Sequence, residues 1–370
     1  MNSRTTSPRE PLLPGSTIGI LGGGQLGRML AVAASRLGMK THIFCPDHQS
    51  PAFDVAKFHT IASYDDKDAL KKFAASVDLV TYEFENVPTK AAHIIEELVL
   101  LAPGVKALET SQDRLLEKRF LQELNIAISP YEPVNSHEQL PHAIKTIGTP
   151  SVLKTTRFGY DGKGQRIIET AKDANSACKE FAGKQLVLEA FVEFDSEISV
   201  VVARNESGQI KAYDPSTNVH KSHILHTSSV PAHIDEATGE EAISIAIKIA
   251  KALQYQGVMA IEFFVCKTDE NQETPPRLLV NEIAPRVHNS GHWTQNACPT
   301  DQFEQHIRAI CNWPLGQTRR MANVVMRNLI GGEINLIPHG LLPNDHPHIY
   351  GKSQSRPGRK MGHVNTVTPR

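Results

Sequence analysis

Short apolar runs alternate with longer amphipathic stretches along most of this chain, and that alternation is typical of an α/β protein. Continuous apolar runs predict buried strands at residues 17–21, 40–44, 78–82 and 151–155. Amphipathic stretches predict helices at about 25–37, 112–124 and 235–253. Several buried strands separated by helices favour a doubly wound sheet in the first part of the chain.

Two further apolar runs, 257–265 and 278–283, are separated by a turn-rich stretch and therefore predict a hairpin. If the hairpin is symmetric about residue 272, Glu262 and Glu282 lie directly opposite each other, because their numbers average to 272. Like charges at directly opposed strand positions are destabilising unless a cation lies between them. A pair of Mg²⁺ ions suits this position, because Mg²⁺ binds one or two carboxylates and completes its ligand shell with substrate phosphates. A slipped register would instead leave one of these glutamates in solvent.

The second of these strands runs into a loop crowded with polar groups, Asn281 to Trp293. Strand ends that direct polar side chains into a loop are where α/β enzymes commonly place their chemistry. The alternative is a strand that ends in a solvated turn. The nearby partner carboxylate Glu262 favours the active-site interpretation.

The strand at 17–21 leads into Gly22-Gly23-Gly24-Gln25-Leu26-Gly27, a GxGxxG loop that opens a helix. Such a loop can hold any phosphate on its amides, so it indicates a doubly wound domain better than it indicates a nicotinamide. A dinucleotide-dependent oxidoreductase remains an alternative function, but it leaves Lys154 and the two glutamates unexplained. The strand at 78–82 ends at Glu83, which faces the ligand-binding edge expected of such a sheet.

The strand at 151–155 carries Lys154 and is followed by a loop, 157–165, that combines three glycines with Arg157 and Lys163. These features predict a loop that closes over phosphates, although it is not a Walker A sequence. A glycine-rich hairpin tip is the alternative. A strand at 185–192 then continues as a linker towards Glu197 and offers backbone groups to an adenine edge.

Composition narrows the class of protein. The 370 residues carry a net charge of −1, so no basic field points to nucleic acid or a membrane surface. No apolar run approaches the roughly 20 residues of a membrane span. The five scattered cysteines indicate reduced thiols and a cytoplasmic protein. The polar, proline-broken residues 1–14 predict a disordered tail.

Taken together, several motifs resemble the ATP-grasp ligases, and within them the 5-(carboxyamino)imidazole ribonucleotide synthetase family of purine biosynthesis. The motifs are Gly-Gly-Gly-Gln-Leu-Gly, Thr-Tyr-Glu-Phe-Glu-Asn-Val, Lys-x-x-Arg-x-Gly-Tyr-Asp-Gly-Lys-Gly-Gln, Pro-Arg-x-His-Asn-Ser-Gly-His-Trp and Gly-Arg-Lys-Met-Gly-His. The resemblance implies four parts: a tail at 1–14, a Rossmann-like pre-ATP-grasp domain at 15–112, an α+β ATP-grasp domain at 113–315 and a small β-rich C-terminal domain at 316–370.

The resemblance also assigns roles to residues. It places ATP against Arg114, Lys154, Gly159, Tyr160, Asp161, Gly162, Lys163, Gly164, Gln165, Glu189, Ala190, Phe191, Val192, Glu197, His220, Asn281 and Glu282. It places Mg²⁺, expected as two ions, on Glu262 and Glu282. The ribonucleotide is expected against Gln25, Leu26, Glu83, Arg286, His288, Asn289, Lys352, Arg359 and Lys360, and the catalytic groups are expected to be Arg286 and Lys154.

The activity implied by the resemblance is carboxylation of 5-aminoimidazole ribonucleotide by ATP and bicarbonate through carboxyphosphate. A homodimer and a hand-off of the product to a separate mutase are implied with it. Thr217 and His223 depart from residues common in the family, which affects the loop beside the nucleotide. A formate-dependent transformylase of the same superfamily is an alternative, disfavoured by the versions of the motifs around Glu83 and Asn289.

Overall fold

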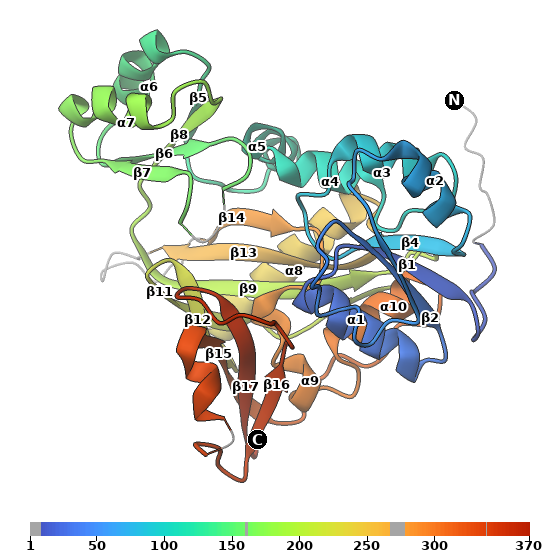
Figure 1. Ribbon diagram of the computed structural model, residues 1–370. Coiled ribbons are helices and arrows are strands. Elements are labelled where there is room, and N and C mark those ends of the chain that lie inside the picture. The colour runs from blue at the N-terminus through green and yellow to red at the C-terminus, as the bar shows by residue number, and fades with distance from the viewer. Residues whose placement is uncertain (1–8, 160–161, 267–277, 338) are drawn as a thin grey trace.

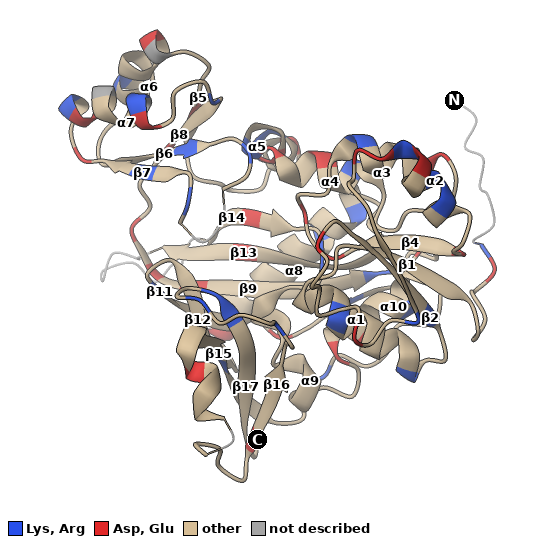
Figure 2. Ribbon diagram, viewed as in Figure 1, with Lys and Arg blue, Asp and Glu red and all other residues tan. Residues whose placement is uncertain are grey.

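The computed structural model describes residues 9–159, 162–266, 278–337 and 339–370 (Figure 1). The described chain forms three β-sheets with helices packed on them. Positive and negative side chains are interspersed over all parts of the fold, in agreement with the net charge of −1 (Figure 2). In the described part of the chain, no helix has the length and apolar character that crossing a membrane requires.

The first sheet is parallel and lies near the N-terminus. Its strand order is β3 (Phe58–Ile61), β2 (Lys40–Cys45), β1 (Thr17–Leu21) and β4 (Leu79–Tyr82). The accompanying helices are α1 (Gln25–Arg36), α2 (Lys67–Ala74), α3 (Thr89–Glu96) and α4 (Val105–Gln112). Ile18, Ile20 and Leu21 of β1 are fully buried, because a central parallel strand is covered on both faces. The predicted doubly wound domain is confirmed.

The second sheet is small and antiparallel, and α5 (Arg114–Glu123) leads towards it. Its strand order is β5 (Tyr131–Val134), β8 (Leu186–Ala190), β6 (Ser151–Thr155) and β7 (Gln165–Ile168). The helices α6 (Leu140–Ile147) and α7 (Ala174–Glu180) pack with it over a separate apolar core that includes Leu153, Ile168 and Leu188. The chain leaves this sheet at Ala190 and enters the third sheet at Phe194, so residues 191–193 form a link between the two sheets.

The third sheet has nine antiparallel strands and crosses the middle of the molecule (Figure 1). Its order is β14 (Leu278–Ala284), β13 (Gly257–Cys266), β9 (Phe194–Arg204), β11 (Ser216–Lys221), β12 (Ile224–Val230), β15 (Asn323–Ile330), β17 (Lys360–Thr368) and β16 (Asp345–Ile349), with β10 (Ile210–Ala212) paired to β9. Its helices are α8 (Glu236–Ala252), α9 (Thr294–Ala297) and α10 (Gln302–Ile310). The 3₁₀ turns of the chain are η1 (His137–Gln139), η2 (Ala171–Asp173), η3 (Asn289–Gly291) and η4 (Gly331–Leu336).

Strand β9 is apolar at successive positions because both of its faces are covered. Val200 and Val202 lie in the core that also holds α8, whereas Val201 and Ala203 lie in the core that holds α1 and α10. A strand buried on both faces reads as a continuous apolar run rather than as an alternation. The C-terminal strands β15, β16 and β17 extend this same sheet.

Two expectations need correction. The tail is not disordered over residues 9–14, because it covers the end of α10: Arg9 donates a side-chain hydrogen bond to the Ile310 carbonyl at 2.9 Å, and the Leu12 N–H donates to the Cys311 carbonyl at 3.0 Å. The last carbonyls of a helix lack partners within the helix, and the tail supplies them. The helix predicted at 112–124 begins only at Arg114, since Asp113 is its N-cap and accepts from the Leu115 N–H at 2.9 Å.

Candidate functional site

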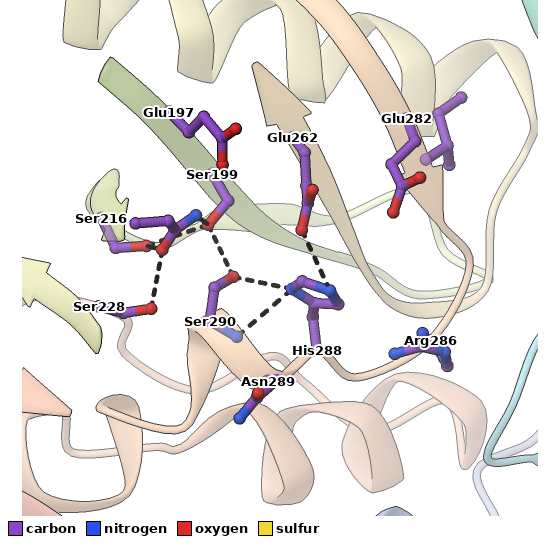
Figure 3. A network of polar contacts seen from close by, with 12 residues as sticks. Glu197, Ser199, Ser216, Ser228, Glu262, Glu282, Arg286, His288, Asn289 and Ser290 are labelled. Carbon is purple, nitrogen blue, oxygen red and sulfur yellow. Dashed lines mark hydrogen bonds and ion pairs between the residues drawn. The ribbon is translucent and has the colours of Figure 1, made fainter. Parts of the chain in front are cut away.

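The predicted carboxylate pair is present across the β13–β14 hairpin. Glu262 and Glu282 are directly paired in register, and the register shifts immediately beyond them, where Phe263 pairs with Val280 and leaves Asn281 as the extra residue of a bulge. Burial and, after it, the charge of Glu282 raise the pKa of Glu262 to about 8. Figure 3 shows both side chains extending to the same side of the hairpin. The slipped-register alternative is wrong.

A cationic group lies at the other end of the site, on the small sheet and α5. Lys154 on β6 and Lys118 on α5 both contact one carboxylate oxygen of Glu189, at 2.9 and 3.3 Å. Burial alone raises the pKa of Glu189, but the two lysines and Arg114 lower it to about 2. Glu189 is therefore an anion at neutral pH. Its second oxygen, Oε1, is buried and has no hydrogen-bond partner in the described structure.

Arg114 connects this cationic group to the carboxylate pair. Its guanidinium lies 3.8 Å from Glu282, and its pKa is raised by Glu282 and Glu189 against the effect of burial. Glu117, one turn further along α5, accepts the Ile283 N–H at 3.1 Å and so ties the helix to β14. Burial and, after it, Glu282 raise the pKa of Glu117 to about 8.

Sequence reasoning did not select Glu117 or Lys118. The signal for both was their spacing from Arg114, because residues three and four apart lie on one face of a helix. That face points into the site, and both side chains are buried.

The glycine-rich loop between β6 and β7 is held at its base by the Thr155 N–H, which donates to the Gly164 carbonyl at 2.8 Å. Gly159 lies close to Arg114, whose Nη2 would be 3.5 Å from a Cβ added at that glycine. At Gly162, φ is +77° and an added Cβ would overlap the His223 ring, so His223 directly faces the loop. Tyr160 and Asp161 lie outside the described residues. Lys163 is exposed and Gln165 is partly exposed.

The link between the second and third sheets joins β8 to β9, and its contact with a nucleotide stays a prediction. Ala190 ends β8, and Phe191 and Val192 continue towards β9. On β9, the Glu197 carboxylate forms an ion pair with the Nδ1 of His220 on β11. Burial lowers the pKa of His220, but the hydrogen bond and charge of Glu197, together with the charge of Glu262, raise the pKa overall.

The glycine loop of the first sheet encloses Glu83. Its Oε2 accepts the Gly27 N–H at 2.6 Å, and its Oε1 accepts the Gly24 N–H. Burial raises the pKa of Glu83 although both amides oppose that shift. Gln25 and Leu26 lie between these two glycines at the start of α1. Glu83 thus shapes this loop, and its contact with a ribonucleotide stays a prediction.

The loop after β4 contributes a second carboxylate, Glu85, which sequence reasoning did not select. Glu85 forms an ion pair with Nε of Arg286, the residue that follows β14 and Pro285. The pKa of Arg286 is raised by Glu85 against the effect of burial. The only sequence signal was that Glu83 and Glu85 follow the same strand, and strand alternation does not say which of them meets a partner.

The polar loop after β14 points back towards the carboxylate pair. The His288 Nε2 lies 3.3 Å from Oε1 of Glu262 (Figure 3). Burial, followed by the charge of Arg286, holds the pKa of His288 well below its usual value, so the ring is neutral. Asn289 exchanges two amide hydrogen bonds, of 2.9 and 2.8 Å, with Asn328 on β15.

The C-terminal cations reach the same region from β17 and the loop before it. Lys352 donates to the Lys360 carbonyl at 2.7 Å, and Arg359 donates to the Gln354 carbonyl at 2.8 Å. Burial and, after it, the charge of Arg359 lower the pKa of Lys352 to about 8. Lys360 acts electrostatically on Glu85, as Lys352 does on Glu83. The structure therefore brings groups from the first, middle and last parts of the chain into one charged site.

Comparisons with known proteins agree with this architecture. The chain matches the family models of the ribonucleotide synthetase preATP-grasp domain over residues 16–112, the ATP-grasp domain over residues 119–303 and the phosphoribosylaminoimidazole carboxylase C-terminal domain over residues 324–370.

Among curated proteins, the chain is 49% identical to the N5-carboxyaminoimidazole ribonucleotide synthase of Brucella melitensis, over 98% of this chain and 99% of that protein. Among solved structures, it is similar to the Staphylococcus aureus N5-carboxyaminoimidazole synthetase complexed with ADP, with a TM-score of 0.91 and 36% identity over 98% of this chain and 96% of the other. It is also similar to the Aspergillus clavatus synthase in complex with ADP and 5-aminoimidazole ribonucleotide, with a TM-score of 0.89 and 28% identity over 97% and 95% of the two chains. On this evidence, the chain belongs to the N5-carboxyaminoimidazole ribonucleotide synthase family of ATP-grasp ligases.

Proposed function

We propose that this chain catalyses the ATP- and bicarbonate-dependent carboxylation of 5-aminoimidazole ribonucleotide, giving N5-carboxyaminoimidazole ribonucleotide, ADP and phosphate in purine biosynthesis. The observation that carries the proposal is the convergence of the paired carboxylates Glu262 and Glu282 with Arg286 and Arg114. Carboxylates and cations at this spacing suit a phosphoryl transfer to an anionic acceptor, because charge develops on several oxygens at once.

The adenine specificity of the site rests on Glu189. Its unpartnered Oε1 is an obligate hydrogen-bond acceptor, because the carboxylate stays ionised between Lys118 and Lys154. The exocyclic amine of adenine is a donor and can satisfy this oxygen, whereas the corresponding carbonyl of guanine cannot. The ATP phosphates would then extend towards the glycine-rich loop, and the ribose towards Glu197.

The carboxylate pair fits Mg²⁺. Glu262 is largely buried and Glu282 partly exposed, and burial followed by the charge of Glu282 raises the pKa of Glu262. Oxygen ligands from one or two carboxylates are what Mg²⁺ takes from proteins that also bind phosphates. Glu262 and Glu282 would hold the ion or the two ions. When bound, Mg²⁺ neutralises charge that develops on the transferred phosphoryl group.

In the first step, a bicarbonate oxygen attacks the γ-phosphorus of ATP, and ADP leaves. Arg286, held by Glu85, would bind the bicarbonate, and Arg114, beside Glu282, would neutralise the transferred phosphoryl group. Lys154, in contact with Glu189, would meet ATP nearer its adenine end. The carboxyphosphate formed hydrolyses readily, so the site must exclude water. In the second step the amine of the ribonucleotide captures the carboxyl group, and phosphate leaves.

The cations Lys352, Arg359 and Lys360 would bind the phosphate of the ribonucleotide, and Asn289 and His288 would lie beside its imidazole. Phosphate binding far from the reacting amine positions that amine against carboxyphosphate. Gln25, Leu26 and Glu83 complete this side of the site.

We extend the proposal to a cytoplasmic homodimer, to domain limits near residues 112 and 315, and to a hand-off of the product to a separate mutase.

The test is ADP release by the purified chain with MgATP and 5-aminoimidazole ribonucleotide, with and without bicarbonate in degassed buffer. ADP formation that depends on both the ribonucleotide and bicarbonate is expected, and Glu262→Gln serves as the control for contaminating ATPase. Equal rates without bicarbonate, or rates restored by formate in its place, would contradict the proposal.

A further inference from the structure

A buried row of hydroxyl and amide side chains lies beside the carboxylate pair, and its side-chain hydrogen bonds lead to His288 (Figure 3). It comes from three strands and η3: Ser199 on β9, Asn218 on β11, Ser228 on β12 and Ser290 in η3. Their exposed fractions are 1%, 6%, 0% and 0%. Polar groups buried this deeply are costly unless every one is paired, so their arrangement is strongly constrained.

The contacts form one continuous path, here called the hydroxyl row: Asn218, Ser199 and Ser290. The Asn218 Nδ2 donates to Ser199 Oγ at 2.9 Å, and the Ser199 hydroxyl donates to Ser290 Oγ at 2.6 Å. Ser290 Oγ lies 2.8 Å from His288 Nδ1. The Ser228 hydroxyl donates to Asn218 Oδ1 at 2.7 Å and holds the amide at the far end.

The path has a direction. An amide nitrogen only donates, so Ser199 accepts from Asn218, and its own hydroxyl donates to Ser290 at 2.6 Å, which is closer than Ser216 Oγ at 3.0 Å. The Ser290 proton is then free to point at His288 Nδ1. The Ser290 backbone N–H, a donor whose orientation is fixed by the chain, also points at Nδ1, at 3.4 Å. Two donors directed at one ring nitrogen require that nitrogen to be the acceptor, which leaves the ring proton on Nε2.

We propose that Asn218, Ser199 and Ser290 are positioning residues that hold His288 in the tautomer with its proton on Nε2, so that an N–H donor faces the space beside Glu262 where the carboxyl group is transferred. This inference rests on the function proposed above and adds to it the groups that orient the histidine. The other tautomer would present a lone pair to an anion bound in this space and would repel it.

Loss of the row should act on the fate of the carboxyl group rather than on nucleotide binding. In Ser199→Ala and Ser290→Ala, His288 can adopt either tautomer, and carboxyphosphate is lost to water in the fraction of turnovers in which the donor is absent. We expect product formation to fall about 10-fold, the lower end of the loss seen when hydrogen-bond partners that orient metal-ligating histidines are removed. The ratio of ADP to product should rise, while KM for ATP should stay within about twofold, since the side-chain hydrogen bonds of the row run to His288, whereas Asn218 adjoins Glu197 through the β9–β11 backbone pairing.

Ser216→Ala is the matched control. Ser216 is also 1% exposed and lies 3.0 Å from Ser199 Oγ, but it is not on the path from Asn218 to His288. It should retain the wild-type ratio of ADP to product. Ser199→Thr, which keeps the hydroxyl, should give a lower ratio of ADP to product than Ser199→Ala.

The tautomer itself can be measured without any substrate, which separates failure of this inference from failure of the proposed function. The chain carries 17 histidines, and ¹⁵N labelling of histidine with His288→Gln as the assignment control identifies the His288 nitrogens. The wild type is expected to show a protonated Nε2 and an unprotonated Nδ1. A proton on Nδ1 in the wild type would overturn the inference, and so would equal ADP-to-product ratios in Ser290→Ala and Ser216→Ala.

Discussion

Glu85 and Arg286, which are 201 residues apart, form a largely buried ion pair that joins the loop after β4 to the loop after β14. Because a carboxylate in contact with a guanidinium fixes the plane of that group, the first domain sets the orientation of the cation expected to bind bicarbonate. The active site is therefore complete only when the first sheet is docked on the large one.

In Glu85→Gln, ATP hydrolysis should become uncoupled from carboxylation of the ribonucleotide. The amide keeps the shape of the side chain but removes its charge, so Arg286 loses its orienting partner. We expect kcat to fall about 10-fold or more, the scale of 1.5–3 kcal/mol for a hydrogen bond to a charged group, with more ADP formed per product. Steady-state assays of both products check this. Glu109→Gln, which changes an exposed pair with His93, should leave both values unchanged. A similar loss in both variants would contradict this role of Glu85.

Glu262→Gln and Glu282→Gln should each lose most turnover while the fold is kept. Each removes one charge from the site expected to hold Mg²⁺, so transition-state neutralisation is lost, and kcat should fall by about 100-fold or more. The melting temperature should not fall, because one of two repelling carboxylates has been removed. Rates measured over a range of Mg²⁺ concentrations, with thermal unfolding in parallel, test both points. Near-normal turnover of both variants at saturating Mg²⁺ would rule out the metal assignment.

Arg359→Ala should raise KM for the ribonucleotide by about 10-fold or more, since a charge-assisted hydrogen bond to phosphate is worth roughly 1.5–3 kcal/mol. KM for ATP should change far less. Arg356→Ala is the matched control: this neighbouring arginine is exposed and donates to the Gln354 side chain. If both variants keep the ribonucleotide KM of the wild type, the phosphate is bound elsewhere.

Glu189 should contribute to stability in a pH-dependent way. Its folded-state pKa of about 2 lies below its ordinary value of 4.5, so the stabilisation is present in full above pH 4.5 and is lost as the pH falls towards 2. The shift corresponds to about 3 kcal/mol. Denaturant unfolding at a series of pH values between 5 and 2 should give a free energy that falls more steeply for the wild type than for Glu189→Gln. Parallel curves for the two proteins would show that Lys118 and Lys154 do not depress the pKa of Glu189.

Local patterns were enough to predict much of this molecule. Apolar runs predicted β1 and β6 with the bounds that the structure has, and the numbering of two glutamates predicted the register of β13 and β14. These features depend on short-range physics: strand periodicity, turn residues and the pairing of neighbouring strands. Joint motifs then predicted the family, because a long ordered set of polar residues rarely recurs by chance.

Tertiary structure alone decided which polar groups meet. Glu83 and Glu85 lie on the same loop, yet one accepts glycine amides and the other pairs with Arg286, far along the chain. Nothing in the sequence around Lys118 names its partner, which is Glu189 on β8, at 3.3 Å. The polar residues 9–14 predicted disorder, but they donate hydrogen bonds to the carbonyls at the end of α10. Each outcome depends on contacts between segments distant in sequence, and neither periodicity nor composition carries that information. The sequence by itself determined the strands, the hairpin and the chemistry to expect, whereas docking of the sheets decided the partners of each charge.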